Sequence, residues 1–179
     1  TFKTVTELIR RLRRINPESS GVFPFTIMFR NWHTITGFMD MTPKPVTAQA
    51  RLSYQPVLIS WESWQNQVYA GSTIKPTAHI INDADDFSDL KNCRLVVRLI
   101  DKAYTVRYSS TIKLPDIPYY AIHSQKLTLD LPKELFTGDY TLEGIVYSED
   151  REVSRNISPL FIAQLGFAGV MPENEIMLY

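Results

Sequence analysis

The sequence predicts a mainly β fold: an immunoglobulin-like β-sandwich preceded by a helix–strand remnant of a (β/α)8 barrel. The sandwich is predicted because the hydrophobic period changes to two at Val57, after which short apolar runs recur about every 8–12 residues with turn residues between them. The remnant is predicted because a helix-periodic segment at 4–15 is followed by an almost wholly apolar run at 22–29.

Composition sets limits on the function. The chain has 179 residues, which is too few for a complete barrel of about 250 residues. Its 44% hydrophobic content is enough for a packed core and excludes the disordered class. The 19 basic side chains balance the 19 acidic ones, so neither a nucleic-acid surface nor a polybasic membrane surface is supported. We therefore expect neither nucleic acid nor a membrane among the partners.

Residues 1–16 predict one amphipathic helix. Thr4 and Glu7 form a capping box at its start, and Asn16-Pro17 ends it. Four arginines lie mainly away from its apolar stripe, and we expect them on a solvated or interface face: Arg10, Arg11, Arg13 and Arg14. A single helix–strand unit cannot bury its own strand. We therefore expect the run at 22–29 to pack against the β domain or a neighbouring chain, or to stay partly disordered.

A proline-stiffened segment then leads into the sandwich. Pro43 and Pro45 predict a semi-extended connector, and residues 46–54 predict a short helix that Pro56 ends. Gly138 and Tyr140 suit a tyrosine corner. About eight strands are expected, at 57–62, 68–70, 73–82, 93–100, 104–112, 125–131, 138–146 and 153–163.

Ordered motifs in both halves of the chain resemble a known family. The matching positions in the first half are Gly21, Phe25, Asn31, Trp32, Gly37 to Asp40, Pro43-Lys44-Pro45, Ala48 and Arg51. Those in the sandwich are Ile80-Ile-Asn-Asp83, Gly138-Asp-Tyr-Thr-Leu142 and Ser154-Arg-Asn156. This pattern resembles the end of the barrel and the following sandwich of glycoside hydrolase family 2, the family of β-galactosidases, β-mannosidases and β-glucuronidases. Two residue types differ from the common ones: Phe25 keeps an aromatic ring where the family commonly has Trp, and Thr42 stands where it commonly has Gly.

The resemblance implies a domain organisation and a function. Residues 1–52 would be the last helix, strand and exit segment of the barrel, residues 53–165 the sandwich, and residues 166–179 a linker or the start of a further domain. The parent would be a retaining glycoside hydrolase whose two carboxylates come from the fourth and seventh barrel strands, upstream of Thr1. We therefore expect the fragment to lack catalytic residues, to be inactive and to support the barrel. Carbohydrate would bind through the parent barrel, in the periplasm or outside the cell.

Asn31 and Trp32 are the candidate substrate-binding residues. They stand at the C-terminal end of the predicted barrel strand, where barrel active sites are built. An indole can stack on a sugar face, and an Asn amide can bond to hydroxyl groups. The competing interpretation is that Trp32 fills the junction between barrel and sandwich.

No metal or cofactor is expected. Asp83, Asp85, Asp86 and Asp89 cluster in one loop, but their spacing lacks the glycine and the terminal Glu of an EF-hand. The glycine patterns of phosphate and dinucleotide loops are also missing from the sequence. Cys93 is the single cysteine, and its apolar surroundings predict a buried thiol with no internal disulfide.

Two alternatives stay open. One is a non-catalytic carbohydrate-binding or adhesion sandwich, which requires exposed aromatic residues in a row; Tyr119, Tyr120 and Trp64 are the candidates. Trp61 and Trp64 are predicted to be one core residue and one rim residue, because their spacing places them on opposite faces of a strand. The other alternative is a barrel-derived protein that has lost its catalytic carboxylates.

Overall fold

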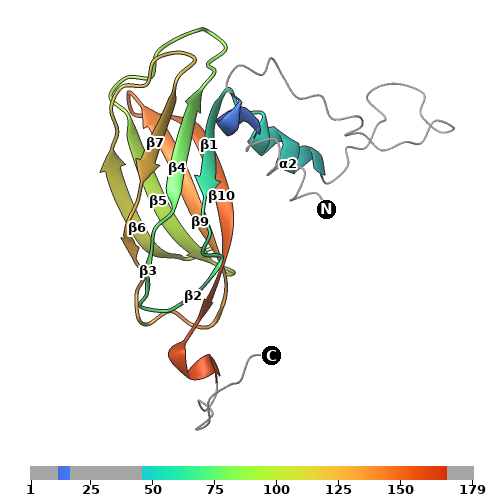
Figure 1. The fold of residues 1–179 in the computed structure, drawn as a ribbon, viewed down its shortest axis with the longest axis vertical. Coiled ribbons are helices and arrows are strands. Elements are labelled where there is room, and N and C mark those ends of the chain that lie inside the picture. The colour runs from blue at the N-terminus through green and yellow to red at the C-terminus, as the bar shows by residue number, and fades with distance from the viewer. Residues whose placement is uncertain (1–11, 17–45, 169–179) are drawn as a thin grey trace, which may run out of the picture.

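The computed structural model describes residues 12–16 and 46–168 (Figure 1). The predicted barrel strand at 22–29, the motif that follows it and most of the predicted C-terminal linker lie outside these residues. In the described part, no helix combines the length and the apolar character needed to span a membrane.

Helical segments precede the strands, as the sequence predicts. Residues 12–15 are helical, and α2 spans Val46–Ser53. The strands of the described part are β1 (Val57–Glu62), β2 (Gln67–Tyr69), β3 (Thr73–Ile74), β4 (Thr77–Asn82), β5 (Arg94–Asp101), β6 (Val106–Lys113), β7 (Ile122–Lys126), β8 (Leu129–Asp130), β9 (Gly138–Ser148) and β10 (Arg151–Ala163). A 3-10 helix, η2 (Leu165–Ala168), follows β10.

The strands form two main sheets and a small third one (Figure 1). The first main sheet has the order β1-β4-β7 and is antiparallel. The second has the order β2-β10-β9-β5-β6; its strands are antiparallel except that β2 runs parallel to β10. The two main sheets pack face to face around one core. The predicted fold class, a mainly β immunoglobulin-like sandwich, is confirmed.

Alternating side chains of the two sheets fill the core. Leu95, Val97 and Leu99 of β5 belong to it, and Ile59 and Ile80 join it from the smaller sheet. None of these five side chains has measurable exposure to solvent. Each fully buried aliphatic side chain of this size stabilises the fold by about 1.5–3 kcal/mol.

Three predictions at single positions are confirmed. Trp61 is 5% exposed and Trp64 is 86% exposed, so one is a core residue and the other a rim residue. Cys93 is buried and has no disulfide, and its burial raises the pKa of the thiol. The hydroxyl of Tyr140 donates to the carbonyl of Phe136 (2.9 Å), which is the tyrosine corner.

Two predicted strands are each split in two. Residues 73–82 divide into β3 and β4 around Lys75-Pro76, because Pro76 has no N–H with which to continue the ladder. The carbonyl of Pro76 instead accepts from the amide of Leu127 (2.9 Å), and residues 125–131 divide there into β7 and β8. The prediction of two continuous strands is therefore wrong; β3 and β8 pair with each other instead.

Gly144 on β9 is required by the ring of Trp61. A Cβ at this position would lie 2.6 Å from Trp61 Cζ2, inside the core. We expect Gly144→Ala to lower the free energy of unfolding by about 1–3 kcal/mol in urea denaturation, because a buried indole cannot move aside without straining its neighbours. Gly138→Ala is the matched control on the same strand, since a Cβ there meets nothing within 4 Å. Equal stability of the two variants would contradict this account.

Candidate functional site

Polar contacts concentrate at the joint between the helical segments and the sandwich. In Figure 1 the helical turn at 12–15 and α2 lie side by side, next to the start of β1. The side chains of Arg13, Gln55, Asp83 and Ser154 and the backbone of Arg155 join them to the strands, and we call this set of residues the docking joint.

Arg13 connects the helical turn to the chain that enters β1. Its Nη1 donates to the carbonyl of Gln55 (2.6 Å), and its Nη2 donates to the carbonyl of Pro56 (3.1 Å) and forms an ion pair with Asp83. A planar guanidinium can satisfy several acceptors in fixed directions, which a lysine ammonium cannot match. The arginine that the sequence places on a solvated or interface face is therefore an interface residue, with 18% of its side chain exposed.

Asp83 is held in place by its neighbour Asn82. The side chain of Asn82 is fully buried, and its Nδ2 donates to the carbonyls of Ser88 (3.0 Å) and Ile117 (3.1 Å). Its Oδ1 accepts from the amide of Ala84 (3.2 Å). Because both ends of the buried amide are satisfied, the loop after β4 leaves the sheet in one direction and presents Asp83 to the helical turn.

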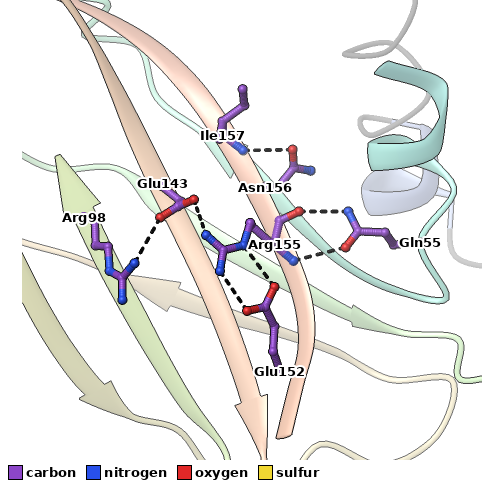
Figure 2. A network of polar contacts seen from close by, with 7 residues as sticks. All are labelled: Gln55, Arg98, Glu143, Glu152, Arg155, Asn156 and Ile157. Carbon is purple, nitrogen blue, oxygen red and sulfur yellow. Dashed lines mark hydrogen bonds and ion pairs between the residues drawn. The ribbon is translucent and has the colours of Figure 1, made fainter. Parts of the chain in front are cut away.

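Gln55 takes the place of a strand partner for β10 (Figure 2). Its Nε2 donates to the carbonyl of Arg155 (2.9 Å), and its Oε1 accepts from the amide of the same residue (3.1 Å). Ser154 Oγ adds a contact to Oε1 (3.3 Å), and Nε2 also donates to the carbonyl of Leu52 (2.7 Å). One side chain thus satisfies both backbone groups of a strand residue and ties α2 to the larger sheet.

Arg155 also centres an ion-pair network on the larger sheet (Figure 2). Its Nε and Nη2 donate to the two oxygens of Glu152 (3.0 and 2.8 Å), and its Nη1 donates to Glu143 Oε1 (2.6 Å). The second oxygen of Glu143 lies 3.8 Å from Arg98 Nη1. Hydrogen bonding to Glu152, and then to Glu143, raises the pKa of Arg155, and Arg155 in turn lowers the pKa of Glu152. Arg155 and Glu152 therefore stay charged, so this pair positions β10 and offers no proton donor for catalysis near neutral pH.

A second polar bridge crosses the smaller sheet. His79 Nε2 lies 2.9 Å from Glu62 Oε2, and His79 Nδ1 lies 2.8 Å from Ser124 Oγ. The hydrogen bond to His79 is the main cause that lowers the pKa of Glu62. Arg14 approaches the same strand end, where its Nη1 donates to the carbonyl of Trp61 (3.4 Å). The bridge links β1, β4 and β7 through their side chains.

The sequence draws attention to two sets of residues: the pair Asn31 and Trp32, and the aspartates of the acidic loop at 83–89. Asn31 and Trp32 lie outside the described residues, so their role in substrate binding stays a prediction. Among residues 12–16 and 46–168, no three His, Cys, Asp or Glu side chains are placed to hold a metal ion. Three carboxylates of the acidic loop instead take protein partners: Asp83 with Arg13, Asp86 with Ser88, and Asp89 with Lys91 and the amide of Tyr119.

The exposed aromatic candidates do not form one row. Trp64 follows the end of β1, whereas the amide of Tyr120 donates to the carbonyl of Asn82 (2.7 Å), which pairs with the first residue of β1. A strand of this length separates the two ends by about 20 Å. Tyr119 and Tyr120 instead contact each other, with ring centroids 5.9 Å apart, and Phe87 lies 5.2 Å from Tyr119. Phe87 carries no sequence signal, because it stands alone among aspartates.

Comparisons with known proteins bear on the fold. No protein-family model matches the chain, and no curated protein matches it in sequence. The C-terminal domain of wzt is similar with a TM-score of 0.50 at 11% identity, covering 69% of this chain and 84% of that one.

Two glycosidase structures are also similar in part. A β-glucuronidase from glycoside hydrolase family 2 has a TM-score of 0.45 at 16% identity, over 62% of this chain and 11% of that one. The exo-chitosanase of Amycolatopsis orientalis has a TM-score of 0.47 at 18% identity, over 67% of this chain and 13% of that one. The chain thus spans a small share of these enzymes.

The docking joint predicts a specific dependence on Arg13. We expect Arg13→Ala to lower the free energy of unfolding by about 1–3 kcal/mol, because it removes hydrogen bonds from a charged donor to carbonyls and a carboxylate. Arg13→Lys should recover little of this loss, since an ammonium cannot reach the same acceptors together.

Hydrogen exchange would show whether the loss of stability is located at the docking joint. We expect the amides of α2 to exchange faster in both Arg13→Ala and Arg13→Lys than in the unmodified chain. Arg51→Ala is the control, because Arg51 lies on α2 with an exposed side chain. An unchanged exchange rate in Arg13→Ala, or the same change in Arg51→Ala, would show that the joint does not depend on the guanidinium.

Proposed function

We propose that this chain is the C-terminal part of a family 2-like glycoside hydrolase, in which the sandwich is a structural domain that supports the barrel. One observation carries the proposal: Arg13, which precedes the segment 17–45, binds the carbonyls of Gln55 and Pro56, which follow it. The two ends of the segment that holds Asn31 and Trp32 are therefore fastened together on the sandwich. A domain that holds the last barrel strand in place would need such a joint.

The sandwich motifs behind the family resemblance supply three of the five residues of this joint. Asp83 comes from the first sandwich motif, next to Asn82, and Ser154 and Arg155 belong to the last one, which ends at Asn156. Asn156 is fully buried and its Nδ2 donates to the carbonyl of Ile59 on β1 (2.7 Å), so this motif also links the two sheets. The matched positions thus have a structural task in the described part, which supports the resemblance.

The carboxylates that lie around Arg155, Glu143 and Glu152, do not suit glycoside hydrolysis. A retaining enzyme needs one carboxyl group that stays protonated to act as an acid and another that acts as a nucleophile. Glu143 and Glu152 share the guanidinium of Arg155, and Arg155 lowers the pKa of Glu152. An acid held ionised in this way cannot donate a proton near neutral pH. We therefore assign hydrolysis to the parent barrel and substrate contacts to Asn31 and Trp32.

The alternative is a non-catalytic carbohydrate-binding or adhesion module. The contact cluster of Phe87, Tyr119 and Tyr120 favours it, because it supplies an exposed aromatic surface. A module of this class would bind glycans without any upstream barrel.

The test is an assay of the parent protein encoded by the complete reading frame. We expect hydrolysis of an aryl β-glycoside by the parent and none by residues 1–179 alone. In the parent, Asn31→Ala and Trp32→Ala should lower kcat/KM with little change in melting temperature, whereas Arg13→Ala should lower both. Arg51→Ala is again the control. A reading frame without an upstream barrel, or a parent that hydrolyses no glycoside, would overturn the proposal.

A further inference from the structure

An aromatic cluster lies on the surface at one end of the sandwich. Phe87 is 72% exposed and Tyr120 is 52% exposed, and Tyr119 between them is partly exposed. The rings of Phe87 and Tyr119 meet edge to face at an interplanar angle of 85°, and those of Tyr119 and Tyr120 are tilted by 41°. Three aromatic side chains from two loops thus contact one another at the surface, and much of their apolar area stays exposed to solvent.

The two loops that carry this cluster are tied to each other. Leu90 and Ile117 exchange backbone hydrogen bonds in both directions, each 2.9 Å. Asp89 Oδ1 accepts from the amide of Tyr119 (2.9 Å), and the buried Asn82 bonds to both loops. The aromatic surface is therefore preorganised, which reduces the entropy lost when a ligand binds.

The backbone is strained where the rings are presented. Phe87 has a φ of 58° and Tyr120 has a φ of 62°, in the left-handed region that bulky side chains avoid. Asn or Gly at these positions would fit the same turns at lower cost. Strained conformations of this kind are concentrated at binding and catalytic sites.

The surroundings of the cluster are acidic. The two loops, 83–91 and 115–121, contain five carboxylates (Asp83, Asp85, Asp86, Asp89 and Asp116) and one lysine (Lys91). Asp85 is exposed, and it makes no hydrogen bond or ion pair with the other described residues. The faces of aromatic rings are also negative. A ligand that complements this surface has a flat apolar face and a positive charge.

We propose that Phe87, Tyr119, Tyr120 and Asp85 form a binding site for a glycan that contains free amino sugars. The C–H face of a pyranose ring stacks on Phe87 or Tyr120, and the ammonium group lies near the ring faces and the carboxylate of Asp85. This site includes neither Asn31 nor Trp32, and it does not depend on the parent being a hydrolase.

The experiment is an NMR titration of the 15N-labelled chain, residues 1–179, with an oligomer of glucosamine. We expect shifts of the amides of residues 85–89 and 118–121 and a saturable binding curve. The N-acetylated oligomer should bind about tenfold more weakly or not at all, because it lacks the charge. Absence of binding, equal binding of the acetylated oligomer, or equal binding of a tri-lysine peptide would overturn the proposal.

Single substitutions in the cluster distinguish a loss of glycan binding from a loss of stability. Phe87→Asn and Tyr120→Asn should weaken binding by about tenfold each, while the stability of the fold is kept or increased, because Asn tolerates the left-handed backbone. Asp85→Asn should weaken binding and reduce its dependence on salt.

Tyr104→Ala is the matched control for these variants, since Tyr104 is also highly exposed (90%) and has a φ of 61°, but lies in a different turn. Weaker binding in Tyr104→Ala, or unchanged binding in Phe87→Asn, would contradict the assigned site. Hydrolysis by the parent should not change in the Phe87 variant, so a failure of this proposal and a failure of the proposed enzymatic function give different results.

Discussion

The arrangement of the helical segments depends on the hydrogen bonds of one guanidinium group, that of Arg13. The end of α2 leaves carbonyl groups without helical partners, and the chain then turns into β1 before the sheet can satisfy them. Arg13 donates to the carbonyl of Ser53 (3.5 Å), the last residue of α2, and to the carbonyls of Gln55 and Pro56 beyond it. It also pairs with Asp83, so it fixes the chain between the end of α2 and the start of β1. Asn82 and Gln55 extend this constraint into both sheets, because each satisfies backbone groups that would otherwise be unpaired.

Much of the fold was predictable because it follows from side-chain periodicity. The alternation that begins at Val57 places one face of β1 in the core, and the spacing of Trp61 and Trp64 separates a buried indole from an exposed one. The tyrosine corner has a local motif, since Tyr140 bonds to a carbonyl four residues upstream. The pairing of β3 with β8 was not predictable, because strands of two residues are too short to show a period.

The docking joint was harder to predict than the fold. Arg13 was one of four similar arginines, and its acceptors are main-chain carbonyls more than 40 residues away, which have no side-chain signature. Gln55 is equally inconspicuous, because its partner is the backbone of a strand 100 residues later. Phe87 was overlooked because a single aromatic residue among aspartates has no periodic pattern, and its ring contact with Tyr119 joins residues more than 30 positions apart.

A net charge of zero for the whole chain does not mean that every part of its surface is neutral. On the larger sheet three arginines are matched locally: Arg94 pairs with Asp150, and Arg98 and Arg155 share Glu143. Such pairs contribute little to the field beyond their immediate surroundings, since the opposite charges cancel and salt screens the remainder. The acidic loops beside Phe87 contain more carboxylates than cations, so negative potential persists at the end where aromatic side chains are exposed. Balanced composition argues against a polyanionic partner for the whole chain, but it leaves a small cationic ligand fully compatible with this end of the sandwich.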